Sequence, residues 1–121
     1  MTIHELLIPQ NGIPWINSND RGHWSLRHDY TRLWRAQART RAARTDLVID
    51  LNRVRIDASV FKARANRYDP ANLYPTAKAV VDGLVDYGLV VDDDWRHVEG
   101  PFLHHGGISA APGLLLRIEE L

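Results

Sequence analysis

The stretch RYDPANLYPTAKAVVDGLVDYGLVVDDD, residues 67–94, predicts a helix, a sharp turn and an acidic end. Apolar side chains recur at the spacing of an amphipathic helix over about 73–87: Ala77, Val80, Val81 and Leu84. Gly88 stands where glycine commonly ends a helix. The apolar segment 89–91 then leads to three adjacent carboxylates: Asp92, Asp93 and Asp94. Such carboxylates repel one another unless water or a cation lies among them.

Four further elements are predicted on either side of this helix. They are strands at 2–9, 53–61 and 113–120, and a helix at 25–44 with Ser25 as its N-cap. Residues 53–61 alternate between apolar and polar side chains, which is typical of a half-buried strand. The order strand, helix, strand, helix, strand predicts an α+β (mixed α/β) fold. We expect one small domain over residues 1–121, with a central mixed sheet flanked by two main helices.

The helix expected at 25–44 has an apolar side and a basic side. The apolar side consists of Tyr30, Leu33, Trp34, Ala38 and Ala42. The basic side consists of Arg32, Arg35 and Arg39, which share one face. The loop before this helix holds Trp15 and Trp24, which either stack on bases or hold the loop against the core.

Charge is unevenly distributed along the chain, although its net value is zero. Residues 1–67 contain 12 Lys and Arg against 6 Asp and Glu, whereas residues 68–121 contain 3 against 9. Thirteen of the 15 cations are arginine, which suits bidentate phosphate contacts. This pattern is what a metal-dependent enzyme acting on a polyanion needs; the alternative is a dipolar surface without a function.

The sequence argues against cysteine chemistry and against a membrane-spanning segment. The absence of cysteine excludes disulfides and thiolate catalysis, which fits a reducing cytoplasm. No apolar run approaches the roughly 20 residues that span a bilayer, so we expect no membrane partner.

A candidate site lies in residues 67–94. Asp69 precedes the helix whose expected N-cap is Asn72, and Lys78, Asp82 and Asp86 follow at i, i+4 and i+8 on one polar stripe. If the segment after Gly88 folds back, it carries the carboxylates of residues 92–94 toward Asp69. Carboxylates from separate elements then converge beside a lysine.

This span resembles the RusA family of Holliday-junction resolvases. In that family an Asp-x-Asp-Asn motif enters a helix, followed by a Lys, an Asp before a small residue and Leu, a Gly, and an apolar stretch ending in Asp-Asp. The matching positions, in order, are Asp69, Asn72, Lys78, Asp82-Gly83-Leu84, Gly88 and Asp92-Asp93. The N-terminal strand, the Asn- and Trp-containing loop and the region of Tyr30 are also similar, so the resemblance covers nearly the whole chain.

Two departures from the family pattern concern the metal site. Ala71 stands where the family has its second motif aspartate, and Lys78 lies two residues further along. Carried over by position, Asp69 and Asp93 are metal ligands and Lys78 assists. The missing ligand is then supplied by Asp82, Asp92, Asp94 or a water, since Mg²⁺ keeps several waters in most protein sites.

The resemblance implies a Mg²⁺-dependent endonuclease, with Mn²⁺ as a substitute, that cleaves branched DNA, chiefly four-way junctions, in recombination and repair. Its expected catalytic residues are Asp69, Lys78, Asp82 and Asp93, and its expected metal ligands are Asp69, Asp82, Asp92 and Asp93. Its expected DNA contacts are Arg35, Arg39, Arg64, Arg67 and Asn72. Paired cuts imply a homodimer, at the nucleoid in the cytoplasm of a bacterial or phage-infected cell.

Plainer alternatives stand beside several of these assignments. Because of Ala71, the chain could be a non-catalytic DNA-structure-binding protein of the same fold. Asn72 could only cap its helix, and Asp82 could only form a surface ion pair with Lys78. The arginine stripe could be an ordinary exposed helix face.

Overall fold

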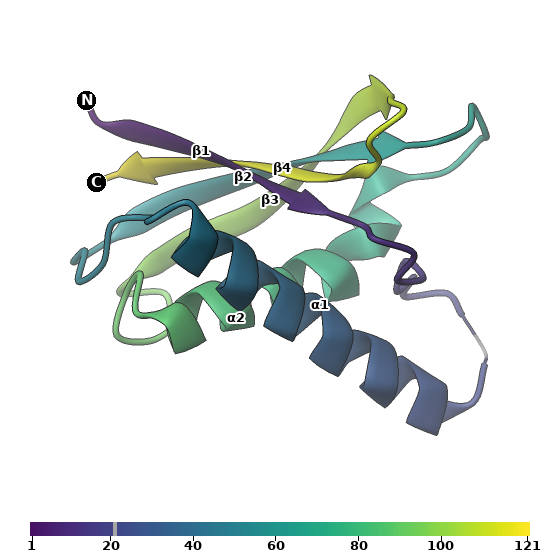
Figure 1. Ribbon diagram of the computed structural model, residues 1–121, viewed down its shortest axis with the longest axis horizontal. Helices are drawn as coiled ribbons and strands as arrows, with labels where there is room; N and C mark the ends of the chain where they lie inside the picture. The colour runs from purple at the N-terminus through teal and green to yellow at the C-terminus, as the bar shows by residue number, and fades with distance from the viewer. Residues whose placement is uncertain (21) are drawn as a thin grey trace.

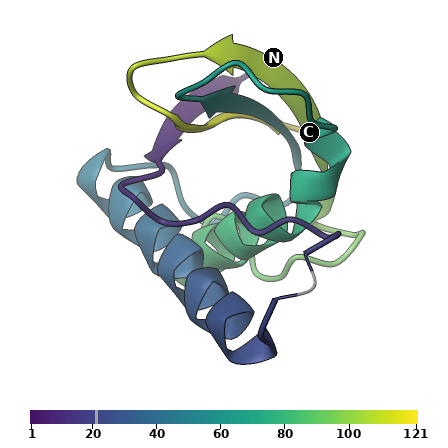
Figure 2. The same cartoon turned by 90° about the vertical axis from the view of Figure 1, so that its right-hand side faces the viewer.

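The computed structural model describes residues 1–20 and 22–121, and within them four strands and two long helices. In chain order the elements are β1 (Ile3–Pro9), α1 (Trp24–Arg44), β2 (Val54–Lys62), the 3-10 helix η1 (Pro70–Leu73), α2 (Tyr74–Tyr87), β3 (Val98–Ile108) and β4 (Gly113–Glu120). The strands form one sheet in the order β1-β4-β2-β3, in which only β2 and β3 run parallel. Both helices lie on one face of this curved sheet (Figures 1 and 2). The predicted α+β fold with a central mixed sheet is therefore confirmed.

The sheet buries one face because its strands alternate as predicted. In β2 the inward side chains are Val54, Ile56, Ala58 and Val60, all with 0% exposure. The register places Ile56 opposite Ile118 and Val60 opposite Leu114, so apolar side chains of neighbouring strands meet on the helix side. Burying each large apolar side chain stabilises the fold by about 1.5–3 kcal/mol. This face is the main core of the domain.

Helix α1 has its N-cap two residues before the position expected from the sequence. His23, not Ser25, is its N-cap, and the His23 side chain accepts the backbone N–H of Ser25. Trp34, Ala38 and Ala42 are buried as predicted. Leu33 is 50% exposed, so its assignment to the apolar side is wrong.

The two helices cross in close contact at Gly83. A Cβ atom at this position would lie 2.2 Å from the carbonyl oxygen of Arg35 and 2.9 Å from the Cβ of Ala38. Only glycine allows the backbones to approach this closely without a shift. The crossing fixes how the polar face of α2 meets the arginines of α1.

The segment after α2 differs from the prediction. Gly88 ends the helix in the left-handed region, at φ 109°, as expected. Leu89 and Val90 are then buried without forming a strand, and the N–H of Leu51 donates to the carbonyl of Leu89 at 2.8 Å. The strand that follows is β3, which the sequence did not indicate. The triple aspartate therefore lies in a loop between α2 and β3.

Within the described residues, no helix is long and apolar enough to cross a membrane.

Candidate functional site

A lysine and two carboxylates meet at the polar face of α2. Lys78 donates to Oδ1 of Asp82 at 2.6 Å, one turn further along the helix. Its Nζ also contacts the carboxylate of Asp93, which arrives from the loop after α2. We call these three side chains the lysine–carboxylate cluster. The predicted fold-back of the acidic segment therefore occurs, and it is directed to Lys78.

The cluster is half-buried, with its side chains 27–38% exposed. Burial lowers the pKa of Lys78, but its hydrogen bonds to Asp82 and Asp93 outweigh burial and raise that pKa above its ordinary value. The hydrogen bond from Lys78 in turn holds the pKa of Asp93 below its ordinary value, against the opposing effect of burial. The cluster is thus one ammonium held between two carboxylates at neutral pH.

The other two aspartates of the triplet shape the loop. Oδ1 of Asp92 accepts the N–H of Asp93 at 2.7 Å. Asp94 accepts the N–H of Arg96 at 3.0 Å and lies 2.7 Å from Nδ1 of His97, just before β3. By accepting backbone N–H groups, these two carboxylates stabilise the turn that brings Asp93 to Lys78.

Asp69 has a local role at the start of η1. Its carboxylate accepts the N–H of Ala71 at 3.0 Å, which makes Asp69 the N-cap of that helix. The expected cap at Asn72 is therefore wrong, because the chain turns into helix before that residue. The carbonyl of Asn72 accepts the N–H of Ser18 at 2.8 Å and holds the preceding loop. In the described part of the chain, Lys78 pairs with Asp82 and Asp93 and not with Asp69.

The oxygen donors of the cluster fit a hard cation in part. Among residues 1–20 and 22–121, no three His, Asp or Glu side chains form a group that could hold a metal ion by themselves. Mg²⁺ is, however, commonly bound by one or two carboxylates together with substrate phosphates and waters. Asp82 and Asp93 supply two such carboxylates; Asp92 is engaged with its own loop, and Asp69 would have to leave the Ala71 amide.

Arginines of α1 line a hollow beside the cluster. This surface, which we call the arginine hollow, has a volume of about 630 Å³ and includes Arg32, Arg35, Arg39 and Arg44. Arg35 binds Asp86 of α2 bidentately, with Nε–Oδ2 at 2.5 Å and Nη2–Oδ1 at 2.8 Å. The Arg35 hydrogen bond holds the pKa of Asp86 below its ordinary value, against the opposing effect of burial. Arg35 therefore joins the two helices as well as facing the hollow.

A second basic hollow, of about 360 Å³, lies between the loop after β2 and the end of β3. Arg64 and Arg67 line it, as does a pair that the sequence gave no reason to expect, Tyr68 and His105. The Tyr68 hydroxyl lies 2.5 Å from Nδ1 of His105, and Lys62 Nζ lies 4.0 Å above the Tyr68 ring. Tyr68 lies in the loop after β2 and His105 lies in β3, so this pair can be recognised only from its contact in the folded structure.

No protein-family model matches this chain, and no curated protein matches it in sequence.

Proposed function

We propose that this chain is a Mg²⁺-dependent endonuclease that cleaves branched DNA, four-way junctions above all, in recombination and repair. The observation that carries the proposal is the convergence of Asp93, from the loop after α2, on Lys78 and Asp82. The basic hollows around Arg39 and around Arg64 and Arg67 support it, since arginine clusters suit phosphate binding.

In this proposal the cluster changes partners when DNA arrives. Asp82 and Asp93 would hold Mg²⁺ with the help of a DNA phosphate and waters, since one or two carboxylates suffice when substrate phosphates complete the site. Mg²⁺ bound there would supply Lewis-acid activation of a water and would neutralise charge on the phosphate. Lys78, released from the carboxylates, would contact the same phosphate and stabilise its developing negative charge. Arg39, Arg64 and Arg67 hold the flanking phosphates.

Two cuts across one junction require two active sites. We therefore propose that the protein acts as a two-fold homodimer, because a closed dimer presents two identical sites in opposite directions. Its place of action would be the cytoplasm, where bacterial or phage DNA is found.

A second candidate function is non-catalytic binding of branched DNA. Two observations favour it. Ala71 carries no carboxylate, and Lys78 already occupies the position between the carboxylates of Asp82 and Asp93. In this case the arginines would serve for affinity alone, and Lys78 with its two partners would only fasten the loop to α2.

Incubation of the purified protein with a labelled four-way junction separates the two functions. We expect cleavage with Mg²⁺ or Mn²⁺ and none with a chelator, while junction binding persists in both conditions. Junction binding that weakens with salt but never leads to cleavage, under any divalent ion, would favour the non-catalytic protein. Absence of binding to junction DNA at low salt would contradict both candidates.

A further inference from the structure

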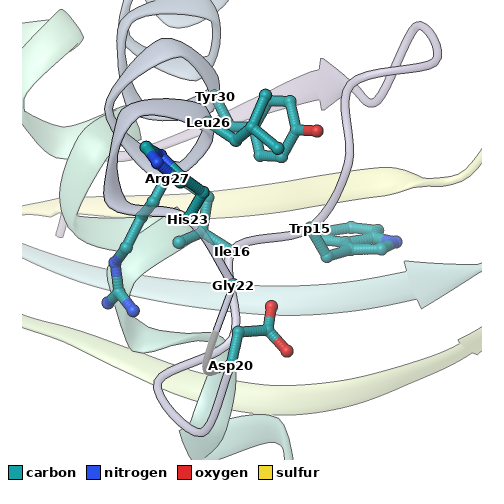
Figure 3. A pocket seen from close by; sticks show the side chains of 8 residues that line it. All are labelled: Trp15, Ile16, Asp20, Gly22, His23, Leu26, Arg27 and Tyr30. Carbon is teal, nitrogen blue, oxygen red and sulfur yellow. The ribbon is translucent and has the colours of Figure 1, made fainter.

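A small pocket lies where the loop after β1 meets the first turns of α1. Its volume is about 210 Å³, and it is lined by Trp15, Ile16, Asp20, Gly22, His23, Leu26, Arg27 and Tyr30. Figure 3 shows Trp15 and Ile16 on the loop, with Leu26 and Tyr30 projecting from α1 above them. None of these residues belongs to the lysine–carboxylate cluster or to the two basic hollows.

The apolar side of this pocket is held in place by the core. The Trp15 ring stacks on the fully buried Trp34, with ring centroids 5.2 Å apart and planes inclined by 29°. The backbone of Ile16 is bound at both its N–H (2.8 Å) and its carbonyl (3.0 Å) by the hydroxyl of buried Thr76. One wall of the pocket is thus an aromatic ring in a fixed position.

The size and chemistry of the pocket select a flat aromatic ligand. Drug-sized ligands occupy pockets of roughly 300–1,000 Å³, so 210 Å³ suits a single ring system. Trp15 and Tyr30 offer rings for stacking. The carboxylate of Asp20 offers an acceptor at the edge, and Arg27 offers a cation. A ligand that is an aromatic ring with amino groups, attached to an anionic chain, meets all three requirements. Its ring stacks on Trp15 or Tyr30, its amino group donates to Asp20, and its anion pairs with Arg27.

Arg27 is the cation of this pocket. At 3.6 residues per turn it is turned by about 80° from Arg35 and about 120° from Arg39, so it does not share the face of the arginine hollow. Arg27 can therefore pair with the phosphate that adjoins a base held in the pocket.

We propose that the pocket binds one unstacked nucleobase of a DNA strand, with the adjoining phosphate paired to Arg27. The inference rests on the proposed function, because unstacked bases occur at the crossover of branched DNA and in single strands. Asp20 accepts a hydrogen bond from an exocyclic amino group, so cytosine, adenine and guanine, which each carry one, bind better than thymine, which has none. The pocket thus helps to select where on a junction the protein binds, and it takes no part in the cleavage step.

Tryptophan fluorescence with short single-stranded oligonucleotides tests the pocket directly. We expect oligodeoxycytidine to quench the wild-type protein more strongly than oligothymidine does, and the quenching to disappear in Trp15→Phe. Leu26→Glu should weaken binding about tenfold more than Leu33→Glu. These two leucines are a matched pair, since both lie on α1, both are 50% exposed, and only Leu26 lines the pocket. Gly22→Leu adds a bulky side chain to the lining of the pocket without a charge change and should also weaken binding.

The outcomes separate the pocket from the proposed function. Thermal melting first establishes that each variant is folded. Equal effects of Leu26→Glu and Leu33→Glu, with Gly22→Leu binding as wild type, would overturn the nucleobase pocket, even if junctions are bound and cut. Loss of oligonucleotide binding in Leu26→Glu with junction cleavage retained would support the pocket and show that cleavage does not depend on it. Failure of the folded wild-type protein to bind any DNA would overturn both.

Discussion

Gly83→Ala should destabilise the domain through the crossing of α1 and α2. The added Cβ would lie 2.2 Å from the carbonyl oxygen of Arg35, which belongs to the backbone and cannot rotate away. The helices must then separate, at a cost near the upper end of the roughly 1–3 kcal/mol typical of overpacking. Alanine in place of glycine inside a helix returns about 1 kcal/mol. The expected net loss is about 2 kcal/mol of unfolding free energy.

Urea unfolding followed by circular dichroism measures this loss. With a slope of about 2 kcal/mol per molar urea, the midpoint should fall by about 1 M. Gly22→Ala is the matched control, because a Cβ at Gly22 would have no described heavy atom within 4 Å. That control should unfold at the wild-type midpoint or slightly above it. If Gly83→Ala is as stable as the wild type, the close crossing of the helices is not real.

Three further predictions concern other parts of the structure. Thr76→Val removes the hydroxyl that binds both backbone groups of Ile16, so it should cost about 1–3 kcal/mol in the same unfolding assay, whereas an unchanged midpoint would deny that anchor. Burial raises the pKa of Asp57, but hydrogen bonds from Arg55 and His104 outweigh it and hold that pKa below its ordinary value. This contribution to stability is therefore complete above about pH 4 and is lost as the pH falls through the lowered pKa, so Asp57→Asn should flatten the dependence of the urea midpoint on acid pH. Arg39→Ala should reduce the slope of log junction affinity against log salt concentration by about one without loss of stability, and an unchanged slope would exclude a phosphate contact at Arg39.

The strongly periodic segments could be predicted from the sequence. The alternation in β2 and the helical spacing with the C-terminal glycine in α2 were sufficient, since these patterns depend on local geometry. Strand β3 could not be predicted in the same way. It contains Pro101 and two consecutive glycines, which break the alternation. Its exposed side chains are a mixture of polar and apolar types: His104, His105, Phe102 and Ile108.

The candidate site shows the same division between local and long-range information. The ion pair of Lys78 with Asp82 follows from i, i+4 spacing. The arrival of Asp93 could be expected only from the turn at Gly88, and the bidentate pair of Arg35 with Asp86 depends on the helix crossing, which no local pattern reveals. Asp69 was expected beside the other carboxylates; the structure shows its carboxylate as the N-cap of η1, where it accepts the N–H of Ala71.

Cleavage of a labelled four-way junction by Asp93→Asn and Asp94→Asn, in Mg²⁺ and at equal protein concentration, tests the central proposal most directly. Both variants lose one negative charge in the same loop, but only Asp93 contacts Lys78, whereas Asp94 binds His97. We predict that Asp94→Asn cleaves within a few-fold of the wild-type rate, while Asp93→Asn loses about 100-fold or more and still binds the junction. Wild-type cleavage by Asp93→Asn would contradict the assignment of the lysine–carboxylate cluster as the active site.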